Sequence, residues 1–214
     1  MRCACCDRVF EGDGLEICPD CLKGLQLGGN PNRDNLLSLF LCGRIKYRYA
    51  ASLAAYEPQN HLSELLRMAK YGNRPRINSC LTRLLAERCN PVHWPGDIDA
   101  IIPVPIHWRR LLRRGYNQVT PIADTLSEMW HVPVWNDVLL RRHFAASQVG
   151  HTWQDRYDHQ RASLRVSHID RLRGRHLLLV DDICTTGATL LAAAERLLEV
   201  PGVQVSFITL GKAI

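Results

Sequence analysis

The segment of residues 176–198 constrains the fold of this chain more than any other part of the sequence. Its four apolar residues at 177–180 are too few for a helix and are typical of a strand buried on both faces. Two carboxylates follow, Asp181 and Asp182, and a polar turn at 185–189 then leads into a helical run. A strand, a polar turn and a helix in this order predict an α/β fold with a ligand site at the carboxyl end of the strand.

The turn after the two acids has the composition of a phosphate-binding loop. Its backbone N–H groups would point at one phosphate, assisted by the N-terminus of the following helix. Glycine allows close approach of the backbone, and the threonine hydroxyls can donate further hydrogen bonds. The predicted phosphate-binding residues are Thr185, Thr186, Gly187, Ala188 and Thr189. A turn that binds nothing is the less favoured interpretation, because paired acids beside it are costly without a ligand.

The N-terminal segment contains two Cys-x-x-Cys pairs, which predict a metal site. Each pair can bring two thiolates onto one tetrahedral ion, and four thiolates are typical of structural zinc. The four predicted ligands are Cys3, Cys6, Cys18 and Cys21. The segment is too short to bury a core, so one bound Zn²⁺ would supply its folding free energy. Cys5 is an additional thiol that could compete as a ligand, and the alternative for the whole set is free surface thiols.

The cysteine count and the hydropathy narrow the class of protein. The chain has 214 residues and nine cysteines, and its N-terminus lacks the apolar stretch of a secretion signal. We therefore expect reduced thiols or metal ligands in a cytoplasmic protein. No apolar run approaches about 18 residues, so no membrane-spanning helix is expected.

The net charge of +6 is concentrated between residues 106 and 176. This region holds twelve arginines and no lysine against six acidic residues, a difference of +6. Arginine without lysine favours planar recognition of phosphate or carboxylate, and solvated surface is an equally good interpretation of the charge. Four arginines follow a predicted strand and could bracket a diphosphate: Arg109, Arg110, Arg113 and Arg114.

The rest of the pattern predicts alternating strands and helices. Strands are expected at 49–56, 99–105, 138–140, 163–166 and 203–210. Helices are expected at 58–71, 78–88 and 117–129, with a short one near 36–40. Residues 141–160 are polar and predict either a mobile lid or a disordered loop. The alternation predicts a mostly parallel sheet with flanking helices at 42–214, preceded by a zinc knuckle and its connector at 1–41.

The run from the buried strand to Thr189 resembles the motif by which type I phosphoribosyltransferases bind phosphoribosyl pyrophosphate (PRPP). The resemblance implies that the loop holds the 5′-phosphate of PRPP. It also implies that Asp181 and Asp182 meet the ribose hydroxyls and the Mg²⁺-bound sugar. The expected fold is therefore that of a type I phosphoribosyltransferase.

Nearly the whole chain resembles the ComF family of competence-associated, phosphoribosyltransferase-like proteins. The shared motifs are the cysteine knuckles, Lys70-Tyr71, Pro103-Val104-Pro105, Arg110-x-x-x-Arg114-Gly115-Tyr116-Asn117-Gln118, Gln148 with Arg156, and the loop that follows Asp182. The resemblance implies a cytoplasmic role in natural transformation or DNA utilisation. It implies PRPP with Mg²⁺ and single-stranded DNA as ligands, and a competence helicase or recombination factor as a candidate partner.

Two functions fit these features, and they use the basic residues differently. In an active phosphoribosyltransferase, basic residues would hold the leaving diphosphate and close a lid over it: Lys70, Arg110, Arg114 and Arg156. In a binding module, PRPP would bind without turnover and further arginines would contact single-stranded DNA: Arg109, Arg113, Arg141 and Arg142. No general base and no pocket for a nucleobase can be identified in the sequence.

Overall fold

The computed structural model describes residues 1–3, 5–11, 17–71, 74, 76–89, 94, 97–106, 111–112, 115–141 and 152–214. Several residues with predicted roles lie outside this part of the chain: Arg109, Arg110, Arg113, Arg114, Arg142 and Gln148. No helix of the described residues is long and apolar enough to cross a membrane.

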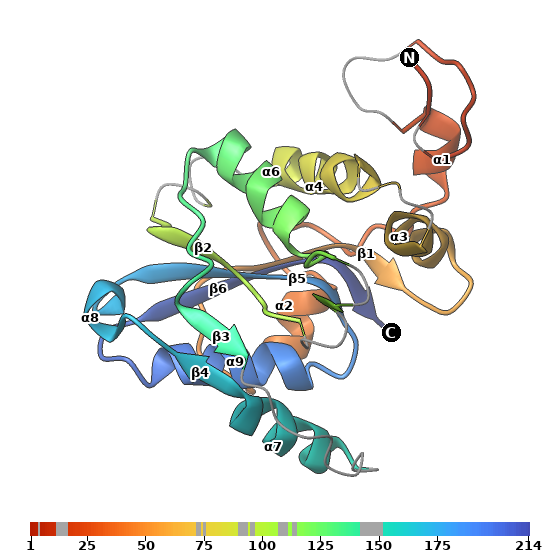
Figure 1. Cartoon of the computed structure of the whole chain (residues 1–214). Helices are drawn as coiled ribbons and strands as arrows, with labels where there is room; N and C mark the ends of the chain where they lie inside the picture. Colours follow the sequence, from red (N-terminus) through yellow and green to blue (C-terminus); the bar gives the residue numbers. More distant parts are fainter. Residues whose placement is uncertain are drawn as a thin grey trace.

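A four-stranded parallel sheet forms the centre of the molecule (Figure 1). Its strands lie in the order β1 (Ala50–Tyr56), β6 (Gln204–Ala213), β5 (His176–Cys184) and β2 (Ala100–Pro103), and all neighbouring pairs are parallel. The carboxyl ends of all four strands therefore meet at one edge of the sheet, where α/β proteins bind their ligands. This sheet confirms the predicted fold class.

The central strand β5 is buried on both faces, and its side chains alternate between two layers of helices. Leu178 and Val180 pack with α3 (His61–Tyr71), α4 (Arg76–Arg88) and α6 (Thr120–Trp130). Leu177 and Leu179 pack with α2 (Leu36–Leu41) and α9 (Ala188–Leu198) on the opposite face. Figure 1 shows the first three helices above the sheet and the other two below it. Burial on both faces explains the unbroken apolar run in the sequence.

A small ribbon of two strands lies beside α9. β3 (Leu139–Arg141) and β4 (Leu164–Val166) form an antiparallel ribbon, and the short α8 (Ile169–Leu172) precedes β5. Leu139 and Leu164 of the ribbon belong to the same hydrophobic cluster as α9. The ribbon therefore extends the core below the sheet.

Helix α3 begins at His61 rather than near residue 58, where the sequence predicted its start. The side-chain oxygen of Asn60 accepts a hydrogen bond from the backbone N–H of Ser63 at 2.9 Å, and the Ser63 hydroxyl donates to the Asn60 carbonyl. Asn60 thus satisfies an N–H group that the first turn leaves free, which places the start of the helix after it. Pro58 lies in the turn before the helix.

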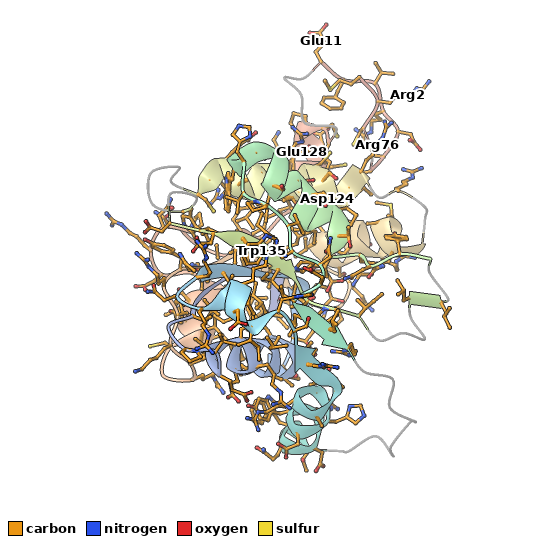
Figure 2. All side chains as sticks on the ribbon, turned by 60° about the vertical axis from the view of Figure 1, so that its left-hand side comes forward. Arg2, Glu11, Arg76, Asp124, Glu128 and Trp135 are labelled. Carbon is orange, nitrogen blue, oxygen red and sulfur yellow. The ribbon has the colours of Figure 1, made fainter. Side chains whose placement is uncertain are left out.

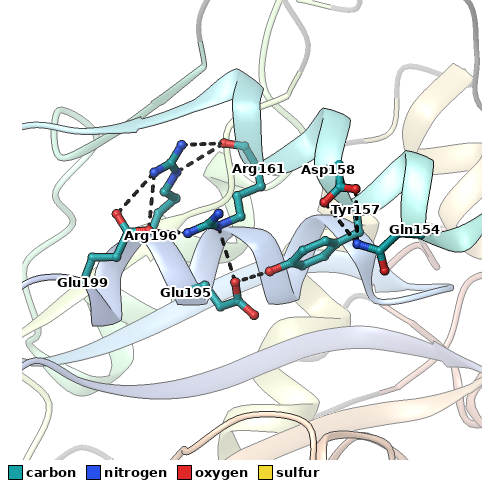
Figure 3. A network of polar contacts seen from close by, with 7 residues as sticks. All are labelled: Gln154, Tyr157, Asp158, Arg161, Glu195, Arg196 and Glu199. Atoms are coloured by element: carbon teal, nitrogen blue, oxygen red, sulfur yellow. Dashed lines mark hydrogen bonds and ion pairs between the residues drawn. The ribbon is translucent and has the colours of Figure 1, made fainter.

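The segment predicted as a lid or disordered loop contains a helix, α7 (Trp153–Ser163). Thr152 begins it with a capping box, in which its hydroxyl and the carboxylate of Asp155 bond to each other's backbone N–H groups. The helix lies against α9, as Figure 3 shows at close range. The expectation of a disordered loop was wrong for residues 153–160, because the partners of this helix are on α9 and cannot be inferred from local composition.

The contact between α7 and α9 is made by polar side chains (Figure 3). The guanidinium of Arg161 lies 2.8 Å from Glu199 and 3.5 Å from Glu195. The hydroxyl of Tyr157 donates to the Glu195 carboxylate, and Arg196 donates to the carbonyl oxygen of Arg161. Helix α7 is therefore fixed on α9 by ion pairs and hydrogen bonds.

The N-terminal segment projects from one end of the molecule. Figure 2 shows Arg2 and Glu11 on this lobe, far from the ribbon of the sheet. It contains the short helix α1 (Pro19–Lys23), and Cys18 and Cys21 belong to the buried cluster on the α3 side of the sheet. The guanidinium of Arg74 also joins the lobe to the domain, at 3.1 Å from the Cys5 carbonyl oxygen. A domain boundary at residue 41 stays a prediction.

Candidate functional site

The turn between β5 and α9 has the backbone geometry of an anion-binding helix N-terminus. Gly187 has a φ of +75° and precedes Ala188, the first residue of α9. A side chain at Gly187 would overlap the ring of Phe40, so both the conformation and the space require glycine. Thr185 and Thr186 are exposed beside this turn. Free N–H groups at the start of a helix and exposed hydroxyls are suitable donors for a phosphate.

The two acids lie at the last part of β5, immediately before this turn. The backbone N–H of Asp182 donates to the carboxylate of Asp181 at 2.8 Å. The backbone N–H of Ile183 donates in the same way to the carboxylate of Asp182 at 2.7 Å. Burial and the neighbouring charge of Asp182 raise the pKa of Asp181 well above the ordinary range of a carboxyl. The pair therefore favours a cation between or beside the two carboxylates.

Lys70, in the last turn of α3, provides one such cation. Its ammonium lies 2.5 Å from a carboxylate oxygen of Asp182, and both side chains are mostly buried. Lys70 was predicted among the residues that contact the diphosphate, and the structure brings it to the acid pair. Arg156, predicted in the same set, lies exposed on α7, and Arg110 and Arg114 are outside the described residues.

Trp153 contacts the phosphate-loop candidate from the α7 side. Its indole N–H donates to the carbonyl oxygen of Thr186 at 2.9 Å, and its ring stacks on Tyr157 at 5.2 Å. The Trp153 residue is 41% exposed, so its ring lies at the surface and not in the core. The Thr152–Asp155 capping pattern and the spacing of the two aromatics were the available signals for this helix.

Lys212, near the end of β6, contacts the loop from the other side, and sequence reasoning missed it. Its ammonium donates to the carbonyl oxygen of Thr185 at 3.4 Å and lies 4.6 Å from the centre of the Phe40 ring. Only 7% of Lys212 is exposed. A lysine directly after the apolar run of the last strand was the signal in the sequence, because such a side chain is seldom buried without a partner.

The N-terminal thiols form a cluster with the dimensions of a tetrahedral metal site. The sulfurs of Cys3 and Cys21 are 3.9 Å apart, and those of Cys6 and Cys18 are 3.7 Å apart. A Zn–S distance of about 2.3 Å gives a tetrahedral edge of about 3.8 Å, which fits both distances. All four sulfurs lie within 4.8 Å of one another. The four predicted cysteines are therefore brought together and could hold a metal.

Backbone donors further adapt Cys3 to a metal. The N–H groups of Cys5 and Cys18 lie 3.4 and 3.3 Å from its sulfur. Burial opposes the thiolate of Cys3, but these donors and that of Cys6 outweigh it and lower its pKa to about 6. The thiolate is the form that binds metal, so this environment suits a ligand.

The arginine-rich region is only partly available as a basic surface. Arg161, Arg171, Arg173 and Arg175 form ion pairs with carboxylates. Arg141, predicted to contact nucleic acid, is half-buried and donates to the side-chain oxygen of Gln160 at 2.7 Å. In the part of the chain that the structure describes, Arg156 and Arg165 are exposed and form no ion pair.

Residues 112–212 match the phosphoribosyl transferase domain family. DNA utilization protein YhgH of Escherichia coli K12 is 30% identical over 207 residues, which cover 92% of this chain and 83% of the relative. Competence protein F of Haemophilus influenzae is 36% identical over 137 residues, which cover 60% of this chain and 58% of the relative. The match and the parallel sheet define a phosphoribosyltransferase-like domain of type I. The chain belongs to the ComF family.

Two solved structures resemble part of the backbone of this chain. Adenine phosphoribosyltransferase from Saccharomyces cerevisiae has a TM-score of 0.39 at 17% identity, covering 70% of this chain and 72% of that chain. Orotate phosphoribosyltransferase from Mycobacterium tuberculosis, solved with PRPP, has a TM-score of 0.36 at 16% identity, covering 71% of this chain and 86% of that chain.

Proposed function

We propose that this protein binds PRPP at the carboxyl end of β5. The observation that carries the proposal is the direct succession of an acid pair and a glycine-started helix N-terminus at one strand end. The loop at 185–189 would hold the 5′-phosphate through backbone N–H groups and hydroxyls. Asp181 and Asp182 would accept hydrogen bonds from the ribose hydroxyls.

Mg²⁺ fits the same acids, because carboxylate oxygens are its preferred protein ligands. Bound there with PRPP, it would neutralise part of the diphosphate charge. The chain would add its own cations. An ammonium has three donors, so Lys70 can hold Asp182 and still donate to an anionic oxygen of the ligand. Arg110 and Arg114 are the proposed further contacts of the diphosphate, and Arg156 stays a proposed lid residue.

Trp153 has a positioning role in this proposal. The carbonyl oxygen of Thr186 is held by the indole, and the indole is held by a helix docked on α9. This arrangement limits the conformations of the loop before a ligand arrives. Preorganisation of the donors favours binding, because less conformational entropy is lost on association.

Thermal unfolding of the full chain tests PRPP binding. A ligand specific for the folded state at 100 times its Kd stabilises it by about 2.7 kcal/mol, which corresponds to roughly 5–10 °C for a chain of this size. PRPP with Mg²⁺ should raise Tm more than ribose 5-phosphate, diphosphate or PRPP without added Mg²⁺. Equal effects of all four, or no effect of any, would contradict the proposal. Release of diphosphate with a panel of nucleobases then decides whether bound PRPP is turned over.

The proposed biological role is DNA utilisation in the cytoplasm, including the handling of single-stranded DNA. The relatives named for DNA utilisation and competence support it. Cytoplasmic thiols stay reduced, which suits the buried Cys89 and Cys184, neither of which forms a disulfide. Arg156, exposed in the first turn of α7 after Trp153, adds positive charge on the side of the loop that Trp153 contacts.

Salt dependence of DNA binding tests the second part of this role. We expect weak binding of a labelled oligonucleotide, with a log–log slope of about −0.7 for each phosphate contact. Replacing Arg113 and Arg114 by alanine should reduce the slope by roughly 1.4 if both contact phosphates. Fluorescence anisotropy at several salt concentrations measures it. A signal that does not change with salt would reject phosphate binding by these residues.

Structural zinc at the four-cysteine cluster is the last part of the proposal. The tetrahedral spacing of the sulfurs supports it, and the four ligands would be Cys3, Cys6, Cys18 and Cys21. A filled set of four thiolates leaves no position for substrate, so the ion would stabilise the lobe. Elemental analysis of the Cys18→Ser, Cys21→Ser double variant should show loss of zinc. Retention of the full zinc content would overturn the assignment.

A further inference from the structure

A second group of metal-ligand side chains lies beside the four-cysteine cluster. One ligand atom from each of Cys5, Cys21 and His61 lies within 4.8 Å of the others. The two thiols come from the N-terminal lobe, whereas His61 is the first residue of α3. The group therefore joins the lobe to a helix of the phosphoribosyltransferase-like domain.

The environment of His61 indicates a missing partner. Its Nε2 is buried and has no hydrogen-bond partner among the described residues. Buried polar atoms in folded proteins nearly always have such a partner. Gly24 is packed against the imidazole, since a Cβ there would lie 2.8 Å from Cγ of His61. The imidazole of His61 therefore fills the space beside Gly24, and any larger residue at position 24 would collide with the ring.

The chemistry of the three side chains selects a class of ligand. Two thiols and one imidazole form a donor set typical of zinc-class divalent cations. Cys21 also belongs to the four-cysteine cluster, so its sulfur lies between the two groups. Three protein ligands would leave the fourth tetrahedral position to water or to an external ligand.

We infer that Cys5, Cys21 and His61 bind a second zinc-class cation, with the sulfur of Cys21 bridging it to the ion of the four-cysteine cluster. The inference rests on the proposed zinc site and extends the single ion expected from the sequence. It also links the metal to the proposed PRPP site. Helix α3 begins at His61 and contains Lys70, the partner of Asp182, in its last turn.

The number of bound ions tests this inference on the full chain. The protein would be stripped of metal under reducing conditions, dialysed against excess Zn²⁺, freed of unbound ion and analysed by mass spectrometry for zinc. We expect two ions per chain in the wild type and one in Cys5→Ser and in His61→Ala. Cys42→Ser and His159→Gln change an exposed cysteine and an exposed histidine elsewhere, and should retain two.

Each outcome of this count has one meaning. One ion in the wild type, or two ions in either Cys5→Ser or His61→Ala, overturns the second site and leaves the four-cysteine site intact. No ion in the wild type overturns both sites. If His61→Ala does not fold, Cys5→Ser decides alone.

Cobalt provides an independent readout of the ligand set. Titration of the stripped protein with Co²⁺ should give two successive absorption changes, the first from four thiolates and the second from mixed thiolate and imidazole ligation. His61→Ala should remove only the second change. A single change in the wild type would overturn the inference.

Discussion

The ammonium of Lys70 lies 2.5 Å from a carboxylate oxygen of Asp182, although the two residues are on different elements of the fold. The pair joins the last turn of α3 to the carboxyl end of β5. It balances one of two adjacent acids in a mostly buried environment, and it places a cation where an anionic ligand is proposed to bind.

Replacing Lys70 by methionine should weaken binding of PRPP with Mg²⁺. Loss of a hydrogen bond to a charged group costs about 1.5–3 kcal/mol, which is roughly tenfold to hundredfold in Kd. Lys46→Met is the matched control, because Lys46 is exposed on a loop before β1. Calorimetric titration of both variants measures the difference. Equal affinities for the two variants would remove Lys70 from the binding site.

Trp153→Phe should weaken the same binding by a smaller factor. The substitution removes the indole N–H that donates to Thr186 and keeps an aromatic ring against Tyr157. One neutral hydrogen bond contributes about 0.5–1.5 kcal/mol, so Kd should rise roughly twofold to tenfold. Trp135→Phe is the control. The Trp135 ring packs against the guanidinium of Arg171, whose carbon lies 3.7 Å from the ring centre, and not against the loop at 185–189. A positioning role is rejected if both variants bind PRPP like the wild type.

Gly187→Ala should be more destabilising than Gly43→Ala. Both glycines have a positive φ, of 75° and 72°, so alanine strains both by about 1–2 kcal/mol. Only Gly187 faces the ring of Phe40, and overpacking adds about 1–3 kcal/mol. Urea denaturation gives the two losses of stability. In a double-mutant cycle, Phe40→Ala should remove most of the excess at Gly187, and the absence of such coupling would contradict the packing argument.

His176 should make folding stability depend on pH below neutrality. Its ring nitrogens lie 2.9 Å from the Asp97 carbonyl oxygen and 2.8 Å from the Ser206 hydroxyl. Burial, opposed in part by the Asp97 carbonyl, lowers the pKa of the imidazole below its ordinary value of 6.5. Between the lowered pKa and 6.5 the unfolded chain binds more protons than the folded one.

The resulting stability is complete above about pH 6.5 and decreases as the pH falls below it, by at most about 1.4 kcal/mol per pH unit. Denaturation of wild type and His176→Gln between pH 5 and 7.5 isolates the effect. The wild type should lose more stability than the variant on acidification. Parallel pH profiles would show that His176 titrates alike in the folded and unfolded states.

The sequence predicted the sheet better than the connections between its elements. Strands β1, β2, β5 and β6 appear within a few residues of their predicted positions, because burial on both faces gives continuous apolar runs. Helix α7 was not predicted, because its mostly polar residues are stabilised by Glu195 and Glu199 on α9, a helix that packs against it but is distant in sequence. Long-range ion pairs leave no periodic signal in a single sequence.

The same distinction holds for the site. The acid pair and the loop at 185–189 are contiguous, so their order alone predicts a phosphate site. The pairing of Lys70 with Asp182, the approach of Lys212 to Thr185 and the position of His61 beside Cys21 depend on tertiary packing. Local pattern cannot predict contacts between elements whose relative position is set by the whole core.

Titration calorimetry with PRPP and Mg²⁺ on wild type and on Asp181→Asn, Asp182→Asn tests the central claim most directly. The wild type should bind one PRPP per chain. The double variant should fold, since both acids lie at a partly exposed strand end, and should lose most of its affinity. Thr186→Val should lose about 1–3 kcal/mol of binding free energy. Unchanged isotherms in these variants, or no heat with the wild type, would contradict PRPP binding at the end of β5.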